Sequence, residues 1–353
     1  MLSYLIVLIT ALAATVIFLP LAKIMGRRMN IWDHPDELGM HQNSTPRSGG
    51  IAIIFGIWVA LEACWLLSGL NMGERQLAAM GIGSLELFII GLLDDLHEIK
   101  PQIKAIGLVA AGITIMLVSR HLPLTGYERL DFMLGIFVLI AGANALNFMD
   151  GMDGLASGLT AITSLGFLTL ALLAGDVILA CWAAILAGAA GGFWTVNKPP
   201  AKIFMGDSGS LVLGGALGWM ALMLGSHGPV FLLAAFILLS WLVIDASLAI
   251  IRRIVMHRDI FSGDRRHVYD LMYHRYGSVW KINRVMCLFQ LIFVLLAVSS
   301  RYLHWTIPAG LALVLWLGIV FWMIRLGMFA PVDPGGIPIT KEAKSWNRDP
   351  MEE

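Results

Sequence analysis

Long apolar runs recur along this chain of 353 residues, and each is long enough to cross a lipid bilayer. In lipid such a run is stable only as a helix, because its backbone hydrogen bonds must close within the segment. The mean hydropathy is +0.79 and only 14% of the residues are charged, which excludes an ordinary soluble globule. The sequence therefore predicts an all-α fold, a polytopic integral membrane helix bundle.

We expect about eleven transmembrane helices, joined by polar connections too short to form a separate soluble domain. This organisation predicts a single integral membrane domain over residues 1–325 and a short cytoplasmic tail, rich in Pro and Gly, over residues 326–353. The predicted spans are residues 2–22, 50–70, 76–93, 103–119, 132–146, 155–174, 177–194, 209–225, 229–251, 284–300 and 306–324.

The distribution of positive charge predicts the orientation in the membrane. No basic residue precedes the first span and a basic cluster follows it at residues 23–28, so we expect an uncleaved first span with its N-terminus outside. With eleven spans, the 24 Lys and Arg then lie on the cytoplasmic side except for Arg75, Arg120, Arg129 and Arg301.

Three acidic, glycine-containing islands interrupt the apolar sequence. They are IIGLLDDLHEIK around Asp94 and Asp95, NALNFMDGMDGLASG at 144–158, and IFMGDSGSLVLGG at 203–215. The predicted topology places all three at cytoplasmic ends of spans, together with the basic loop DIFSGDRRHVYD at 259–270. Polar clusters from distant parts of the sequence therefore share one face.

Helix capping is the structural alternative for these aspartates. Asp207, in Gly-Asp-Ser-Gly, could cap the helix that follows it. Asp94 and Asp95 close a helix, where negative charge opposes the helix dipole, so we expect this pair to require a cation instead. Helix starts after Gly154 and Ser208 would offer free N–H groups to phosphate oxygens.

Carboxylates for a divalent cation, combined with N–H and basic groups for phosphates, indicate phosphoryl transfer. Mg²⁺ fits such a donor set best, and we expect Mn²⁺ to be able to replace it. The three cysteines, Cys64, Cys181 and Cys287, lie in predicted spans, and we expect them to be packing residues without a disulfide or metal role.

These motifs, together with DHPDELGMHQNSTPRSGGIAI at 33–53, resemble those of the polyprenyl-phosphate N-acetylhexosamine-1-phosphate transferase superfamily, glycosyltransferase family 4. The resemblance follows the family's motif order and covers almost the whole chain. It implies a magnesium-dependent enzyme of the cell inner membrane with a cytoplasmic active site. The implied reaction transfers a sugar-1-phosphate from a UDP-sugar to polyprenyl (undecaprenyl) phosphate and releases UMP, as the first membrane step of O-antigen or related cell-envelope polysaccharide synthesis.

The resemblance also implies the roles of individual residues. The metal ligands would be Asn147 and Asp207. The catalytic residues would be Asp94, Asp95, Asp150, Asp153 and His267, with Asp150 and Asp153 in the nucleotide-sugar pocket. The substrate-binding residues would be Lys104, which matches a pyrophosphate-contacting base, with Asn144, Asp245, Arg265 and Arg266.

The last basic loop departs from two branches of the family. DRRHVYD keeps only His267, where other branches have HIHH or a histidine triplet. It is more similar to the O-antigen-initiating branch, which can use an N-acetylhexosamine or an N-acetylated deoxyhexose, and a muramyl-pentapeptide phosphotransferase stays the alternative. We expect Arg265 and His267 to contact phosphate, and we expect no phosphate role for Tyr269 and Asp270.

The expected mechanism is direct attack by the lipid phosphate, which is mostly a dianion at pH 7 because its second pKa is about 6. Asp94 and Asp95 would then organise the metal or position substrate, since a general base has little to remove. An ion-coupled transporter is the alternative from another class, but transporters place acids near the bilayer midplane, often within inverted repeats, and no repeat is evident here. Besides the two substrates and membrane lipid we expect no nucleic-acid partner, and a homodimer is left open.

Overall fold

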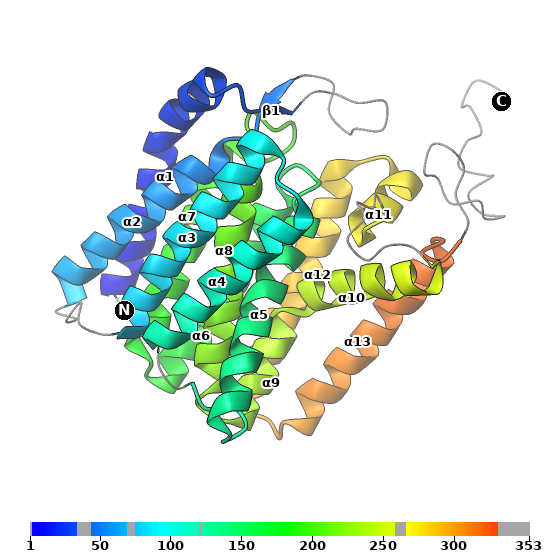
Figure 1. Ribbon diagram of the computed structural model, residues 1–353. Helices are drawn as coiled ribbons and strands as arrows, with labels where there is room; N and C mark the ends of the chain where they lie inside the picture. The colour runs from blue at the N-terminus through cyan, green and yellow to red at the C-terminus, as the bar shows by residue number, and fades with distance from the viewer. Residues whose placement is uncertain (1, 34–43, 69–74, 120–121, 258–265, 331–353) are drawn as a thin grey trace, which may run out of the picture.

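The computed structural model describes residues 2–33, 44–68, 75–119, 122–257 and 266–330, and these form a helical bundle (Figure 1). Its long helices are α1 (Leu2–Arg28), α2 (Gly49–Ser68), α3 (Arg75–His97), α4 (Pro101–Ser119), α5 (Glu128–Met149), α6 (Leu155–Ala174), α7 (Val177–Asn197), α8 (Asp207–Gly225), α12 (Val279–Ser299) and α13 (Thr306–Arg325). The shorter elements are β1 (Trp32–Asp33), β2 (Thr45–Pro46), α9 (Pro229–Leu238), α10 (Ser240–Val255) and α11 (Val268–Tyr276).

The all-α prediction is confirmed, because the strands of the described residues amount to one two-residue antiparallel pair with Trp32 opposite Pro46. Within the described ranges ten helices are long and apolar enough to cross a membrane, or eleven if the bent pair α9 and α10 forms one span. The division into a domain over 1–325 and a tail stays a prediction.

The ninth predicted span, residues 229–251, is not one straight helix. It is α9 and α10, bent by 69° at a break around Leu239, and Figure 1 shows α10 running across the direction of its neighbours. The side chain of Gln290 in α12 donates to the Leu238 carbonyl at 2.9 Å, and Trp316 in α13 donates to Ser240 at 2.9 Å. Side chains that satisfy the freed polar groups permit such a break inside a membrane.

The centre of the bundle is α8, which is buried along its whole apolar length and packs against α2, α3, α5, α6 and α7. Its approach to α5 is close, since a Cβ on Gly142 would lie 2.6 Å from the Gly214 carbonyl oxygen. Small residues allow the close van der Waals packing that holds helices together in lipid. This crossing sets the end of α5 beside the start of α8.

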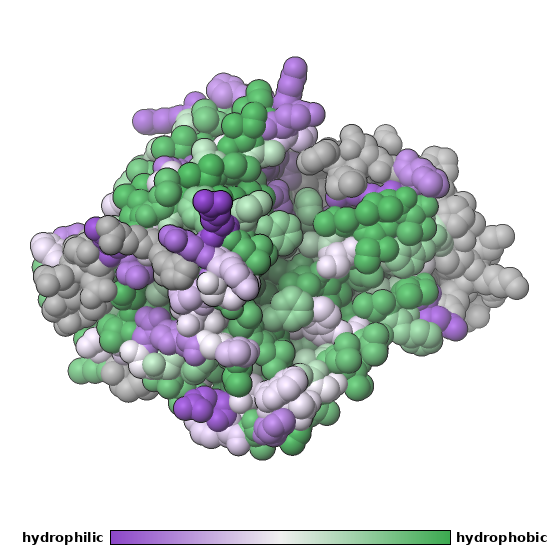
Figure 2. Space-filling model, turned by 60° about the horizontal axis from the view of Figure 1, so that its bottom comes forward, coloured by the Kyte–Doolittle hydropathy of each residue, from purple (hydrophilic) through white to green (hydrophobic). Residues whose placement is uncertain are grey.

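Large apolar areas lie on the face of the molecule that Figure 2 shows. On α13, for example, Val314 is 66% exposed and Phe321 is 64% exposed, and both belong to a helix of which little is buried. Exposed apolar surface on this scale is foreign to soluble monomers and suits contact with lipid. The chain is therefore a multi-pass membrane protein.

Candidate active site

Asp95, in the last turn of α3, caps the start of α8. Its carboxylate accepts the backbone N–H groups of Asp207 at 2.8 Å and Ser208 at 3.0 Å. Gly91, one turn earlier, permits this contact, because a Cβ there would lie 2.4 Å from the Asp207 carbonyl oxygen. Capping therefore does apply to Asp95, although the sequence argument excluded it: Asp95 caps a helix other than its own, where the positive end of the dipole favours its charge. The expected cations are present as well, because the Arg47 guanidinium lies 3.9 Å from Asp95 Oδ1 and the Lys104 ammonium lies 3.1 Å from Asp94 Oδ2.

The expectation of free N–H groups at the start of α8 was also wrong. The N–H groups of Asp207 and Ser208 are bound to Asp95, and those of Gly209 and Ser210 are bound to the Gly206 carbonyl, so α8 offers no free first-turn donors to phosphate. At the start of α6, the N–H groups of Gly154 and Leu155 are bound to the Asn197 side chain and the Met152 carbonyl, and a phosphate contact by the N–H groups that follow stays a prediction. Asp207 does not cap α8 either, because the N-cap is Gly206, with a positive φ of 71°.

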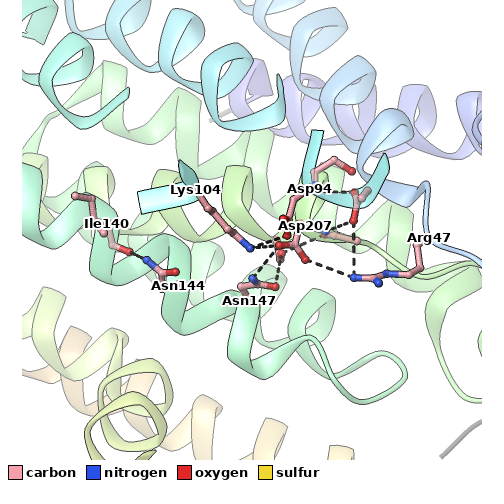
Figure 3. A network of polar contacts seen from close by, with 11 residues as sticks. Arg47, Asp94, Lys104, Ile140, Asn144, Asn147 and Asp207 are labelled. Carbon is pink, nitrogen blue, oxygen red and sulfur yellow. Dashed lines mark hydrogen bonds and ion pairs between the residues drawn. The ribbon is translucent and has the colours of Figure 1, made fainter. Parts of the chain in front are cut away.

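The side chain of Asp207 instead joins a network from α3, α4 and α5 (Figure 3). Its Oδ2 atom contacts Lys104 Nζ and accepts from Asn147 Nδ2 at 3.2 Å. The same Lys104 ammonium lies 3.1 Å from Asp94 Oδ2, and Ser210 donates to Asn147 Oδ1 at 3.1 Å. Five predicted site residues (Asp94, Asp95, Lys104, Asn147 and Asp207) therefore meet at one end of the bundle, which we call the carboxylate cluster.

Arg47 belongs to the same site and was missed from the sequence. It lies between β2 and α2, with its guanidinium 3.6 Å from Asp207 Oδ1 and 3.9 Å from Asp95 Oδ1. Burial lowers the pKa of Arg47, but the nearby carboxylates, Asp95 foremost, outweigh burial and raise it. The only sequence signal was its place in STPRSGG, within the early cytoplasmic segment.

Asp150 and Asp153 follow α5 at the edge of the cluster. Asp150 is the C-cap of α5, and its pKa is raised well above the usual range by burial, with the charge of Asp207 as the next cause. Asp153 Oδ2 accepts the Ala201 N–H group at 2.8 Å, so it ties this turn to the loop between α7 and α8. Their predicted catalytic roles stay predictions.

Asn144 was expected to contact substrate, but the structure does not bring it into the network. Its side chain donates to the carbonyl of Ile140, one turn back on α5, at 2.9 Å. Figure 3 shows this bond apart from the contacts around Asp207. Because α5 carries Asn147 toward Asp207, Asn144 lies one turn away along the helix.

His267 and Asp245 form a second buried pair. His267 Nδ1 lies 2.7 Å from Asp245 Oδ2, and the Val268 N–H group donates to Asp245 Oδ1 at 2.8 Å. The His267 ring stacks on Phe148, with ring centroids 5.3 Å apart, and Phe148 directly follows Asn147. The pair is therefore connected to the carboxylate cluster through the end of α5.

The rest of the basic loop has mainly structural partners. Arg266 is 3% exposed and donates to the Ala330 carbonyl at 2.8 Å. Its position therefore indicates a structural role and not the substrate contact that was expected. The Tyr269 hydroxyl donates to the Phe148 carbonyl at 3.0 Å, and Asp270 accepts the His267 N–H group at 3.0 Å. Arg265 lies outside the described residues, and the nine-residue α11 begins where a loop was expected.

The oxygen donors of the cluster suit a divalent cation. Asp207 and Asp94 already share one positive group, the Lys104 ammonium, and the Asn147 amide lies beside them. Among the described residues no three His, Cys, Asp or Glu side chains are arranged to hold a metal ion by themselves. Mg²⁺ commonly binds to one or two carboxylates and completes its shell with water and substrate phosphate, so Asp207 and Asn147 with Asp94 would fit it.

The chain is similar to known proteins over much of its length. The chain is 30% identical over 283 residues to a probable undecaprenyl-phosphate N-acetylglucosaminyl 1-phosphate transferase of Bacillus subtilis, covering 76% of this chain and 77% of the relative. It is 30% identical to a decaprenyl-phosphate N-acetylglucosaminephosphotransferase of Mycobacterium leprae, over 74% of each chain. A phospho-N-acetylmuramoyl-pentapeptide-transferase of Desulforamulus reducens is 36% identical over 51% of this chain and 60% of the relative.

The sequence profile of Glycosyl transferase family 4 matches residues 77–225, which run from α3 to the end of α8. That stretch contains Asp94, Asp95, Asn147 and Asp207, the residues that the structure gathers. The relatives from Bacillus subtilis and Mycobacterium leprae, each 30% identical over about three quarters of both chains, carry the names of N-acetylglucosamine-1-phosphate transferases. A phospho-N-acetylmuramoyl-pentapeptide-transferase of Bacillus pumilus is 26% identical over 82% of this chain and 92% of the relative. The chain belongs to glycosyl transferase family 4, among the transferases of sugar phosphates to polyprenyl phosphate.

Proposed function

We propose that this protein transfers an N-acetylhexosamine-1-phosphate or an N-acetylated deoxyhexose-1-phosphate from a UDP-sugar to undecaprenyl phosphate, releasing UMP. The observation that carries the proposal is the meeting of Asp94, Asn147 and Asp207 with the ammonium of Lys104 at one end of a membrane bundle. Enzymes of phosphoryl transfer combine oxygen ligands for a metal ion with positively charged side chains that contact phosphate, and this site has both kinds of group. The names of the relatives make UDP-N-acetylglucosamine the first sugar to test.

In the proposed reaction an oxygen of the lipid phosphate attacks the sugar-linked phosphorus of the UDP-sugar. The bond from that phosphorus to the bridging oxygen breaks, and UMP leaves with the oxygen. Since the attacking phosphate is mostly a dianion at pH 7, with a second pKa of about 6, no protein base has to remove a proton. The geometry agrees with this role, because Asp95 uses its carboxylate to cap α8 and Asp94 contacts Lys104.

A magnesium ion at Asp207 and Asn147 would supply positive charge for the diphosphate. The other residues of the site would then position the metal ligands and the substrate. Asp95 holds the start of α8, Ser210 orients the Asn147 amide, and Lys104 provides a cation between Asp94 and Asp207. We propose that this end of the bundle faces the cytoplasm at the inner membrane, because basic side chains such as Lys198 and Lys202 gather on it.

The test is UMP release by purified protein with undecaprenyl phosphate and a panel of UDP-sugars. The panel contains UDP-N-acetylglucosamine, UDP-N-acetylated deoxyhexoses and the UDP-muramyl-pentapeptide. We expect release with one of the first two classes, dependent on both the lipid and Mg²⁺, with Mn²⁺ as a substitute. The reaction breaks one phosphoanhydride bond and forms another, so we expect it to be reversible. Incubating the lipid-linked product with excess UMP should therefore regenerate the UDP-sugar. Release with the pentapeptide alone would assign the protein to the other branch, and no release at all would reject the proposal.

A further inference from the structure

The guanidinium of Arg47 lies beside the carboxylate cluster without hydrogen-bonding to it. Its distances to Asp207 and Asp95, 3.6 and 3.9 Å, are those of ion pairs and are too long for hydrogen bonds. The side chain is 35% exposed, whereas the side chains of Asp95 and Asp207 are 0% and 9% exposed. Within the part of the chain that the structure describes, Arg47 therefore keeps its N–H donors for another group.

Neither carboxylate depends on Arg47 for its hydrogen bonds. The two oxygens of Asp95 accept the N–H groups of Asp207 and Ser208. Asp207 Oδ2 is bound by Lys104 and Asn147, on the side of the carboxylate away from Arg47, as Figure 3 shows. Arg47 is thus attracted to the cluster by charge, and its forked donor set is not needed to build it.

The backbone around Arg47 is held firmly. The Arg47 N–H group donates to the Ile31 carbonyl at 3.2 Å, and the Phe204 N–H group donates to the Pro46 carbonyl at 2.9 Å. Gly49 donates in turn to the Phe204 carbonyl at 2.9 Å, so the segment is bonded to the loop that precedes Asp207. These bonds fix the position of the Arg47 backbone beside the cluster, so binding a ligand through its side chain requires no ordering of the segment.

The charges also favour an anion contact at Arg47. The three carboxylates of Asp94, Asp95 and Asp207 outnumber the two cations, Lys104 and Arg47, so phosphate approaching the cluster needs positive groups nearest to it. Lys104 and Arg47 flank the Asp207 carboxylate on opposite sides (Figure 3). Arginine presents a planar fork that matches two phosphate oxygens, which lysine cannot do.

We propose that Arg47 is a substrate-binding residue whose guanidinium contacts a phosphate group in the carboxylate cluster. The inference rests on the proposed transferase function, because that reaction brings two phosphate-bearing substrates to this site. The phosphate belongs either to the UDP-sugar or to the polyprenyl phosphate, and the two sources share the chemistry that Arg47 recognises.

The test compares Arg47→Gln and Arg47→Lys with Lys202→Gln as the matched control, since Lys202 is an exposed cation at the same end of the bundle outside the network. KM is measured separately for UDP-N-acetylglucosamine and for undecaprenyl phosphate, and UDP binding with Mg²⁺ is measured by calorimetry. We expect Arg47→Gln to raise one KM by roughly ten- to a hundred-fold, the loss of a charge-assisted contact. Arg47→Lys should recover part of the loss, and Lys202→Gln should behave as wild type.

The outcomes separate the sources and the hypotheses. A raised KM for the UDP-sugar with weaker UDP binding assigns the contact to the nucleotide diphosphate, and a raised KM for the lipid with unchanged UDP binding assigns it to the lipid phosphate. A fall in kcat and thermal stability with both KM values and UDP binding unchanged, or no change at all, would overturn the inference and leave Arg47 a structural counter-charge. Failure of the proposed function itself would appear differently, as a folded wild-type protein that neither binds UDP nor releases UMP from any UDP-sugar.

Discussion

The Asp95 carboxylate accepts the backbone N–H group of Asp207 at 2.8 Å, so the last turn of one membrane helix caps the first turn of another. This contact fixes Asp207 at the start of α8 with its side chain toward Lys104 and Asn147. The adjacent aspartates of α3 thus have different surroundings, since Asp95 binds backbone groups and Asp94 binds an ammonium. Their substitutions should therefore have different consequences.

We expect Asp95→Ala to lower the stability of the folded protein, whereas Asp94→Asn should lower activity with little effect on stability. Loss of a helix cap costs about 0.5–2 kcal/mol, and here two buried N–H groups would also lose their acceptor. Thermal unfolding of both variants in detergent measures the difference. An Asp95→Ala protein as stable as wild type would show that the cap contributes nothing.

Asp207→Asn should abolish turnover, with kcat/KM lowered by roughly a hundred-fold or more, while the protein stays folded and inserted in the membrane. The amide keeps the shape of the side chain, but it removes the charge that attracts Lys104 and would hold Mg²⁺. The measurement is kcat/KM over a range of Mg²⁺ concentrations, with thermal stability as the control. Near wild-type activity at low Mg²⁺ would contradict the assignment of Asp207 as a ligand.

His267 should make stability depend on pH. Burial lowers the pKa of His267, but Asp245 at 2.7 Å outweighs burial and raises it. A histidine whose folded pKa is raised stabilises the protein fully below its unfolded pKa of about 6.5, and the contribution is lost as pH rises through the folded pKa. The gap in thermal stability between wild type and His267→Gln should therefore be widest below about pH 6.5 and shrink above it.

Asp245→Asn is the matched variant for that experiment, because it removes the charge that raises the pKa and leaves the His267 ring in place. It should remove most of the same pH dependence. If the difference in thermal stability between wild type and His267→Gln instead grew as pH rises, His267 would be neutral in the folded protein. The activity of His267→Ala, which we expect to fall by roughly ten- to a hundred-fold, is a separate question about phosphate contact.

Cys64 and Cys181 provide a test of the arrangement of α2 and α7. Their Sγ atoms are 2.7 Å apart, so residues interpreted as separate packing positions lie in contact. A mild oxidant such as diamide should convert the two thiols to a disulfide, because each loses one hydrogen to the oxidant as the sulfurs join. Mass spectrometry after denaturing alkylation without reductant should then find one modified cysteine, Cys287.

Cys181→Ala is the control for the oxidation experiment, since Cys64 should then remain open to alkylation. Full alkylation of all three cysteines in the oxidised wild-type protein would contradict the placement of α2 beside α7. The result is independent of the enzymatic activity, because the pair lies far along both helices from the residues at 47–50 and 198–207 that adjoin the site.

Much of the fold was predictable from local sequence. Apolar runs of spanning length can only form helices in lipid, so ten of the predicted spans correspond to ten helices. The bend between α9 and α10 was not predicted from the sequence. The 69° bend depends partly on groups outside residues 229–251: Gln290 of α12 donates to the Leu238 carbonyl, and Trp316 of α13 donates to the Ser240 hydroxyl, which itself donates to the Ile237 carbonyl.

The sequence by itself determined which polar residues would meet, because charged groups in a membrane bundle gather at helix ends and the motifs alternate with spans. Asp94, Asp95 and Asp207 could be named on that basis, whereas Lys104 and Asn147 were named from the resemblance to the family. Only the tertiary structure decided what each one touches. Asp95 caps a helix that begins 112 residues later, and Arg47 approaches two carboxylates from a linker between β2 and α2. Such pairings depend on how closely helices approach, here through Gly91, and no local propensity encodes that distance.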